Sequence, residues 1–160
     1  MPALPDHALV RVSAQDGSMT LFAAQSREQL RGAYRDAWLR RCAGLPLQPL
    51  EAQIADVVAA HPEYQALLTE EAGTLEDFEA AGSAANPFLH MGLHLALRDQ
   101  VGTDRPAGIA AIHQHLAARS GDRHAAEHRM IEVLAQVLSE AQRSGLPPPE
   151  ALYLDRLRQL

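Results

Sequence analysis

The amino-acid sequence predicts an all-α fold, a single-domain bundle of about six helices. Apolar residues recur every three or four positions, Pro, Asn and Gly stand where helices would begin and end, and no segment has the pattern of a convincing buried strand. A chain of 160 residues is also long enough to bury a core without disulfide or metal cross-links. We therefore expect any bound metal ion to serve function rather than folding.

The chain is expected to consist of one domain with a short extension before it. Residues 1–18 contain prolines and only a weak apolar pattern, which predicts a loosely ordered N-terminal extension. Residues 19–160 are expected to form the helical bundle domain. Within that domain, residues 70–85 are acidic and contain glycine, which predicts a connection between helices.

The first half of the domain predicts three helices. Ser26-Arg27-Glu28-Gln29 has the form of a capping box, with Ser26 at the N-cap, and starts a helix that ends near Gly44. Pro49 and Pro62 each stand at a first-turn position, where proline is tolerated, and open a second helix and a short third one.

The second half is expected to hold the centre of the bundle. The helix near 87–101 starts at Asn86-Pro87 and is apolar on nearly every side, which is typical of a helix surrounded by others. We expect it to pack on a long helix near 122–144, which a glycine and three prolines end. Pro106 is expected to open a helix between these two, and residues 149–160 form a terminal helix.

Composition and charge exclude several classes of protein. The formal net charge is −6 and there is no Lys/Arg run, so the electrostatic footprint of a nucleic-acid-binding protein is missing. No apolar run reaches the roughly 18–20 residues that span a bilayer, so we expect a cytoplasmic protein with no membrane partner. The single cysteine, Cys42, excludes an internal disulfide and a thiolate-rich zinc site. Any metal ion must then be held by histidines and carboxylates.

Two pairs of histidines form the best candidate site. His90 and His94 share one face of the central helix, and His124 and His128 share one face of the long helix, because side chains four residues apart lie one turn above each other. The face that carries His124 and His128 continues through apolar residues, so both imidazoles are expected to be buried. Buried imidazoles need polar partners, and one metal ion satisfies several at once. The sequence therefore predicts that the two pairs converge on one divalent transition-metal ion.

Glu127 is the carboxylate adjacent to this predicted ligand set. It could bind the metal, act as a base, or anchor a histidine through that residue's second ring nitrogen. Imidazoles with a carboxylate suit several first-row metals, of which we expect zinc or iron. The two key helices lack the Glu-x-x-His pairs of a di-iron bundle, so a mononuclear site is favoured.

Two other interpretations compete with a metal-binding bundle. The main alternative is a non-catalytic protein-interaction or homo-oligomerisation module, such as a homodimer, in which the histidines are structural. A minor alternative is a zinc hydrolase, because His124-Ala125-Ala126-Glu127-His128 matches the inverted zinc-peptidase motif H-x-x-E-H. Such a peptidase needs a third ligand well downstream and a strand that binds substrate, and neither is evident. The chain has no nucleophile elbow or phosphate loop that would name a reaction.

The remaining histidines have simpler interpretations. His61 precedes Pro62 at a helix break and is expected to be a turn residue with a polar partner, with the role of an outer metal ligand as the alternative. His113 lies on the apolar face of its helix and is expected to be a satisfied core histidine. His115 and His7 are expected to face solvent.

The chain also resembles a bacterial family of domains of unknown function, family 1841, over about residues 19–160. The motifs that carry the resemblance occur in the same order and are Ser26-Arg27-Glu28-Gln29, His61-Pro62-Glu63-Tyr64, the segment 86–97, the segment 104–109, the segment 124–128 and the segment 140–145. The resemblance implies the helical architecture but no reaction. Because it starts near Met19, it also implies that residues 1–18 are an added extension or a misassigned translation start.

Overall fold

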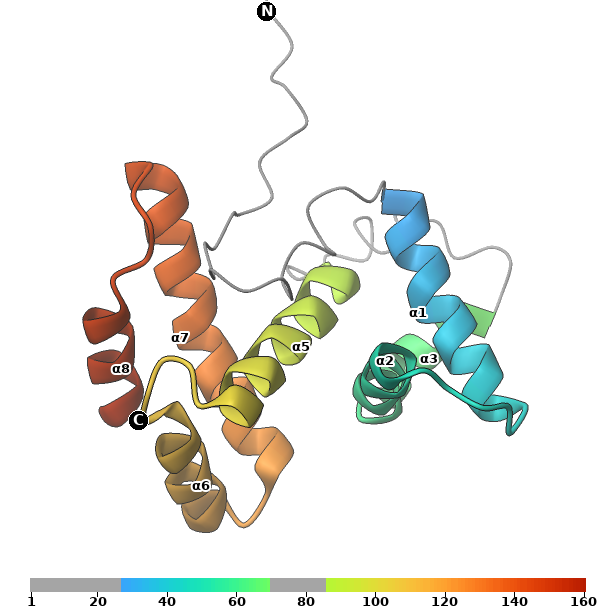
Figure 1. Cartoon of the computed structure of the whole chain (residues 1–160), viewed down its shortest axis with the longest axis horizontal. Coiled ribbons are helices and arrows are strands. Elements are labelled where there is room, and N and C mark those ends of the chain that lie inside the picture. The colour runs from blue at the N-terminus through green and yellow to red at the C-terminus, as the bar shows by residue number, and fades with distance from the viewer. Residues whose placement is uncertain (1–26, 70–85) are drawn as a thin grey trace, which may run out of the picture.

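The structure is a computed structural model that describes residues 27–69 and 86–160, which contain seven α-helices and no strand (Figure 1). In chain order the helices are α1 (Arg27–Cys42), α2 (Pro49–Ala59), α3 (Pro62–Thr69), α5 (Pro87–Thr103), α6 (Ile109–Ser120), α7 (Arg123–Ser144) and α8 (Glu150–Arg158). The prediction of an all-α bundle is confirmed. None of the helices in the two described ranges is long and apolar enough to cross a membrane.

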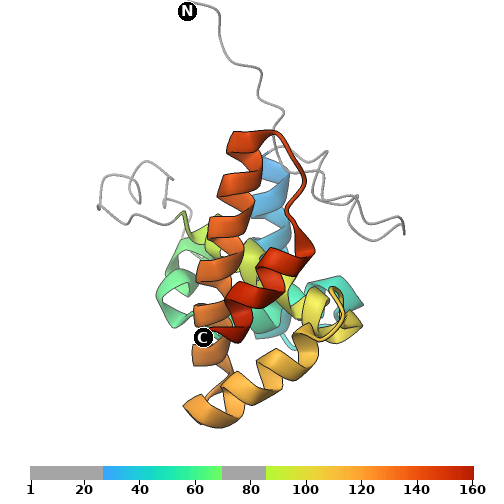
Figure 2. The same cartoon turned by 90° about the vertical axis from the view of Figure 1, so that its left-hand side faces the viewer.

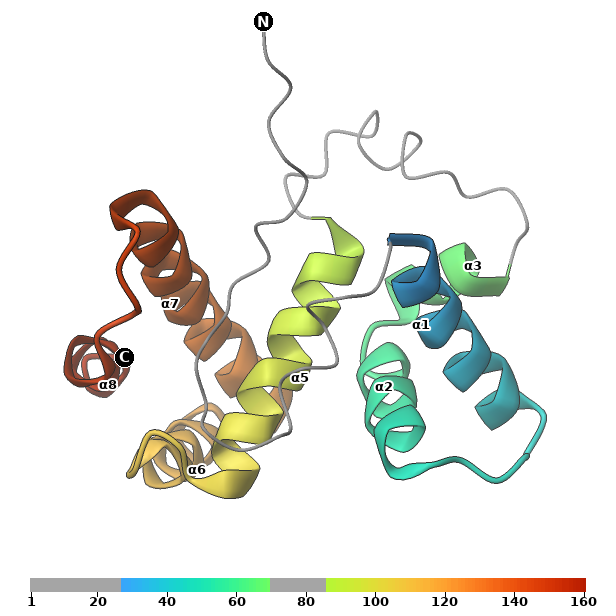
Figure 3. The same ribbon diagram turned by 45° about the horizontal axis from the view of Figure 1, so that its top comes forward.

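Helices α1, α2 and α3 pack together against one side of α5 (Figure 3). The apolar stripe predicted for the second helix is buried here, since Val57 and Val58 have no exposed surface. The buried members of this N-terminal core are Tyr34, Ala37, Ile54, Val57, Val58, Leu68, Met91 and Leu95.

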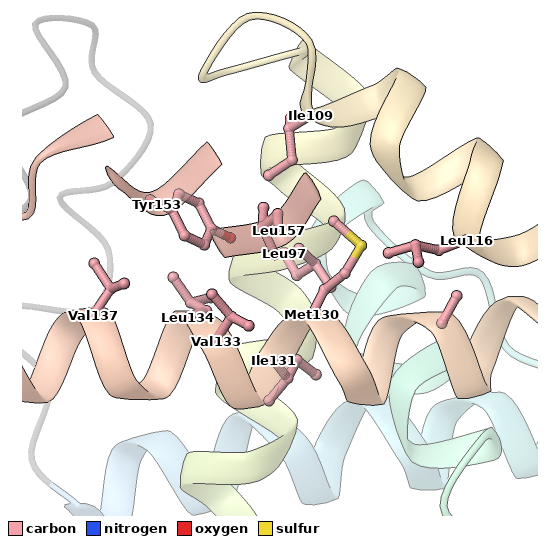
Figure 4. Packing of buried hydrophobic residues seen from close by; sticks show 11 residues of the cluster. Leu97, Ile109, Leu116, Met130, Ile131, Val133, Leu134, Val137, Tyr153 and Leu157 are labelled. Carbon is pink, nitrogen blue, oxygen red and sulfur yellow. The ribbon is translucent and has the colours of Figure 1, made fainter. Parts of the chain in front are cut away.

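Helices α6, α7 and α8 form a second core on the other side of α5. Met130 of α7 has no exposed surface and lies between Leu97 of α5 and Leu116 of α6, with Tyr153 and Leu157 of α8 nearby (Figure 4). Helix α8 packs obliquely against α7, and α6 lies across the end where α7 begins (Figure 2). These contacts hold α7 in a fixed position against α5.

Helix α5 belongs to both cores, as its apolar sequence predicted. Met91 and Leu95 are buried in the N-terminal core, whereas Leu97 is buried in the second core. The Asn86 side chain accepts a hydrogen bond from the Phe88 N–H at 3.0 Å, which confirms the predicted N-cap. A helix with packed neighbours on both sides can bring its side chains together with those of both halves.

One predicted helix start is wrong. The sequence placed the start of α6 at Pro106, but the helix begins at Ile109. Asp104 and Gly108 have φ values of 49° and 98°, which an α-helix does not allow. The Asp104 carboxylate accepts hydrogen bonds from the N–H groups of Gly108 and Ala110, both at 3.0 Å, and so fixes this turn before the helix.

Several expectations fall outside the described residues. They are the extension 1–18, the connection 70–85 and the capping role of Ser26.

Candidate metal centre

Five histidines from three parts of the chain meet between the two cores. His61 lies at the junction of α2 and α3, His90 and His94 lie on α5, and His124 and His128 lie on α7. Among four of the rings, His61, His90, His94 and His128, the six centroid separations run from 4.5 to 5.7 Å. Nearly equal separations mean that these four rings stand around a common centre.

The Nε2 atoms of three rings point at one another. Nε2 of His61 lies 3.2 Å from Nε2 of His90 and 3.1 Å from Nε2 of His94. The Nε2 atoms of His90 and His94 are 3.2 Å apart. Nε2 of His128 is 3.5 Å from that of His61. The closest three nitrogens thus form an almost equilateral triangle, with the fourth just beyond it.

His124 closes the cluster from the other side. Its ring centroid is 4.7 Å from His61, 5.0 Å from His94 and 4.2 Å from His128. His90 already lies on one side of these three rings, so His124 occupies the opposite side. One ring nitrogen from each of His61, His94, His124 and His128 lies within 4.8 Å of the others, a group that could hold a metal ion.

The turn that carries His61 determines which ring nitrogen faces the cluster. Nδ1 of His61 lies 2.7 Å from the carbonyl oxygen of Val57, one turn earlier. A carbonyl oxygen only accepts, so Nδ1 carries the proton and donates it. The neutral ring then has an unprotonated Nε2, which points into the cluster. His61 is fully buried, with the Tyr64 ring stacked on it at 5.5 Å.

Glu127 fixes His94 in the same way. The Glu127 carboxylate accepts a hydrogen bond from Nδ1 of His94 at 2.9 Å. Arg98 donates to the same carboxylate from Nε at 3.1 Å and from Nη2 at 3.0 Å. Burial raises the pKa of Glu127, but the hydrogen bonds from His94 and Arg98 outweigh it and lower the pKa to about 2. Glu127 is therefore ionised, and Nε2 of His94 is left free.

The cluster thus brings lone pairs together. Burial, with the neighbouring imidazoles, lowers the pKa of His90 to about 4, and burial lowers the pKa of His94 to about 4, so both rings are neutral at pH 7. When both rings are neutral, Nε2 of His61 and Nε2 of His94 lack a proton, so their 3.1 Å contact is not a hydrogen bond. His90 is also neutral and therefore has only one ring N–H that it can donate. A cation at the centre would bind all three lone pairs.

The four histidines predicted from the sequence lie in this cluster, but Glu127 lies behind it. Because Glu127 binds Nδ1 of His94, the ring separates its carboxylate from the Nε2 cluster, and of the three roles considered for Glu127 this geometry fits the anchoring one. The carboxylate is also engaged by Arg98, so it is not free to activate water as a peptidase glutamate would.

Sequence reasoning placed His61 outside the main ligand set. It is 29 residues before His90, and no spacing rule links a histidine at a helix break to pairs on later helices. The only signal was its position before Pro62. His113 is buried as expected, but its Nε2 has no hydrogen-bond partner among the described residues, and His115 is exposed.

A groove opens beside the cluster, between α2, α5, α6 and α7. Its volume is about 580 Å³, and its walls include Arg98, His113, Arg123, His124 and Glu127. Of the five clustered histidines, only His124 is among its lining residues. The groove therefore approaches the cluster from the His124 side.

Comparison with known proteins gives one match. A family model described as "Domain of unknown function (DUF1841)" matches residues 26–159. No curated protein and no solved structure matches the chain.

Proposed function

The chain belongs to the DUF1841 family, whose description names no activity, and from the geometry of the site we propose that it binds one divalent transition-metal ion. The ion is held by Nε2 of His61, His90 and His94, with His128 as the fourth ligand and His124 on the side that faces the groove. Glu127 orients His94 from behind and does not bind the ion itself.

One observation carries this proposal. His61 and His94 each donate from Nδ1 to a group that only accepts, so in the neutral rings two unprotonated Nε2 atoms face each other at 3.1 Å. Two buried lone pairs at this distance repel each other and leave both acceptors unsatisfied. A histidine whose second nitrogen donates to a carboxylate or a backbone carbonyl is the usual metal-binding arrangement.

The distances also match the size of a metal ion. Imidazole nitrogens bind zinc at about 2.0–2.1 Å, so two of them on one ion lie about 3.3–3.4 Å apart in a tetrahedral site and about 2.8–3.0 Å apart at right angles. The three Nε2 separations of 3.1, 3.2 and 3.2 Å lie between these values. One ion can thus bind His61, His90 and His94 with their rings where they are.

The donor set narrows the choice of metal. All the donors are neutral imidazole nitrogens, which suit zinc or iron(II) and bind magnesium or calcium poorly. A bound ion of this kind supplies a Lewis acid at the end of the groove.

Elemental analysis with thermal unfolding tests the proposal. We expect untagged protein to contain close to one equivalent of zinc or iron. Adding the preferred metal to metal-free protein, at about 100 times its Kd, should stabilise the fold by about 2.7 kcal/mol and raise the Tm by about 5–10 °C. His94→Ala should abolish the shift, whereas His115→Ala, on an exposed side chain, should keep it. No copurifying metal, with a Tm unchanged by zinc, iron, nickel, copper and manganese, would refute the proposal.

A further inference from the structure

We infer that the groove beside His124 binds a small organic anion, through a carboxylate or phosphate group, and presents it to the metal centre. The claim that the anion is presented to a metal centre rests on the proposed function. The inference starts from the charges that line the groove and from which of them already have partners.

The carboxylates of the groove are all engaged within the protein. Asp56 pairs with Arg41. Asp122 caps α7 by accepting hydrogen bonds from the N–H groups of His124, at 3.0 Å, and Ala125, at 3.2 Å. Glu127 is held by His94 and Arg98. Arg41 and Arg98 neutralise Asp56 and Glu127, whereas Asp122 keeps its charge, which the N–H groups of the first turn of α7 stabilise.

The positive groups of the groove are only partly engaged. Arg123 lines the groove and forms no ion pair or hydrogen bond with any residue in the described ranges. Arg98 gives Glu127 its Nε and Nη2 atoms, which leaves the Nη1 group available. Arg123 is the first residue of α7, and the Asp122 carboxylate already caps the N–H groups of that turn. The groove therefore has guanidinium N–H groups, on Arg123 and at Nη1 of Arg98, that donate to none of the described residues.

His113 is the independent sign of a missing ligand. Its side chain is only 5% exposed and lines the groove, and its Nε2 is closed to solvent without a hydrogen-bond partner in the described part of the chain. A buried polar atom of this kind costs free energy unless something binds it. Burial lowers the pKa of the His113 ring, and the charges of Glu127, Arg123 and Arg98 all act on it. Because this atom is closed to solvent, an anion between the arginines accepts a hydrogen bond from Nε2–H of His113 once the ring turns toward the groove.

The groove is connected to the metal-binding histidines through two of its own residues. Arg98 binds Glu127, which in turn binds Nδ1 of His94. His124 lies both in the groove wall and against the rings of His61, His94 and His128. An anion seated by the arginines is thus next to the side of the cluster that His124 closes.

The size and the remaining walls of the groove indicate the rest of the ligand. A volume of about 580 Å³ is in the range of small-molecule sites. The walls also include Ala60 and Val101, which are partly exposed and offer apolar contact. The ligand class is therefore a small molecule with one anionic group and an apolar body.

Binding of two probes to the full chain tests this inference. Metal-free and zinc-loaded protein are titrated with inorganic phosphate and with benzoate, and binding is followed by calorimetry and by the NMR signals of the His113 ring. We expect at least one probe to bind saturably and to shift the His113 signals, and the choice of probe distinguishes phosphate from carboxylate recognition. Arg123→Gln should weaken binding at least tenfold. Arg143→Gln removes the same charge from the other end of α7, about 30 Å away, and should change the Kd less than twofold.

The outcomes separate the groove from the metal centre. If wild-type protein binds metal but neither probe saturates, or if Arg143→Gln weakens binding as much as Arg123→Gln, the anion site is refuted while the metal centre stands. If a probe binds but no metal does, the anion site stands and its link to a metal is refuted. Tighter binding of the probe, by at least threefold, to the zinc-loaded form supports the link.

Discussion

The Glu127 carboxylate and Nδ1 of His94 lie 2.9 Å apart, and this hydrogen bond joins helices α7 and α5 at the edge of the histidine cluster. It fixes the proton of His94 on the nitrogen that faces away from the cluster. It also places one buried carboxylate, which is paired with Arg98, next to the neutral imidazole of His94. The charge and the orientation of Nε2 both favour a cation at the centre.

Replacing Glu127 should therefore weaken metal binding without removing a ligand. Glu127→Gln keeps an oxygen that can accept from His94 but removes the charge, and we expect the metal Kd to rise by about 10- to 100-fold. Competition with a chromophoric chelator measures the change. Glu132→Gln, on an exposed side chain of the same helix, is the matched control. An equal effect of both substitutions would contradict the anchoring role.

His61 should contribute more to metal affinity than His124. His61→Ala removes one corner of the tight Nε2 triangle, and we expect the affinity for metal to fall at least 100-fold, roughly 3 kcal/mol. His124→Ala removes a ring from the outer side, and a loss of only about tenfold is expected. The same chelator competition compares the two variants. The reverse order would place the ion nearer to α7 than we propose.

The metal-free protein should become more stable when the cluster loses a histidine. His90→Leu replaces a half-buried imidazole, crowded by two lone pairs, with an apolar side chain of similar size. We expect the free energy of unfolding of metal-free protein to rise by about 1 kcal/mol, because unsatisfied polar groups in a buried cluster are costly. Urea unfolding in the presence of a chelator measures it. His115→Leu should give no such gain, and a clear loss of stability in His90→Leu would count against the lone-pair argument.

The core between α5, α6, α7 and α8 should depend strongly on Met130. Met130→Ala leaves a cavity at a side chain with no exposed surface, and we expect it to cost about 2–5 kcal/mol of unfolding free energy. Leu146→Ala, at a side chain that is 67% exposed, should cost less than about 0.5 kcal/mol. Urea denaturation compares the two. Similar losses would mean that Met130 does not occupy the core.

Local sequence patterns predicted the helices, apart from the start of α6. The N-terminal starts of α5 and α7 are set by Asn86 and Asp122. Their side chains accept hydrogen bonds from N–H groups in the first turn of each helix. The start of α6 was predicted three residues too early, because proline permits a first turn but does not require one. The hydrogen bonds that Asp104 accepts form a turn at this point, so the helix begins only at Ile109.

In the candidate site too, local spacing predicts some features and tertiary packing determines others. Helical spacing alone puts His90 next to His94 and His124 next to His128, because residues four apart share a face whatever surrounds the helix. The sequence by itself therefore determined the all-α fold, the central place of α5 and the pairing of these histidines within each helix. Tertiary packing decided the rest. It brought His61 in from the α2–α3 junction, turned Glu127 to the back of His94 and opened the groove at His124. Contacts between segments this far apart depend on how whole helices pack, and no local spacing rule records that arrangement.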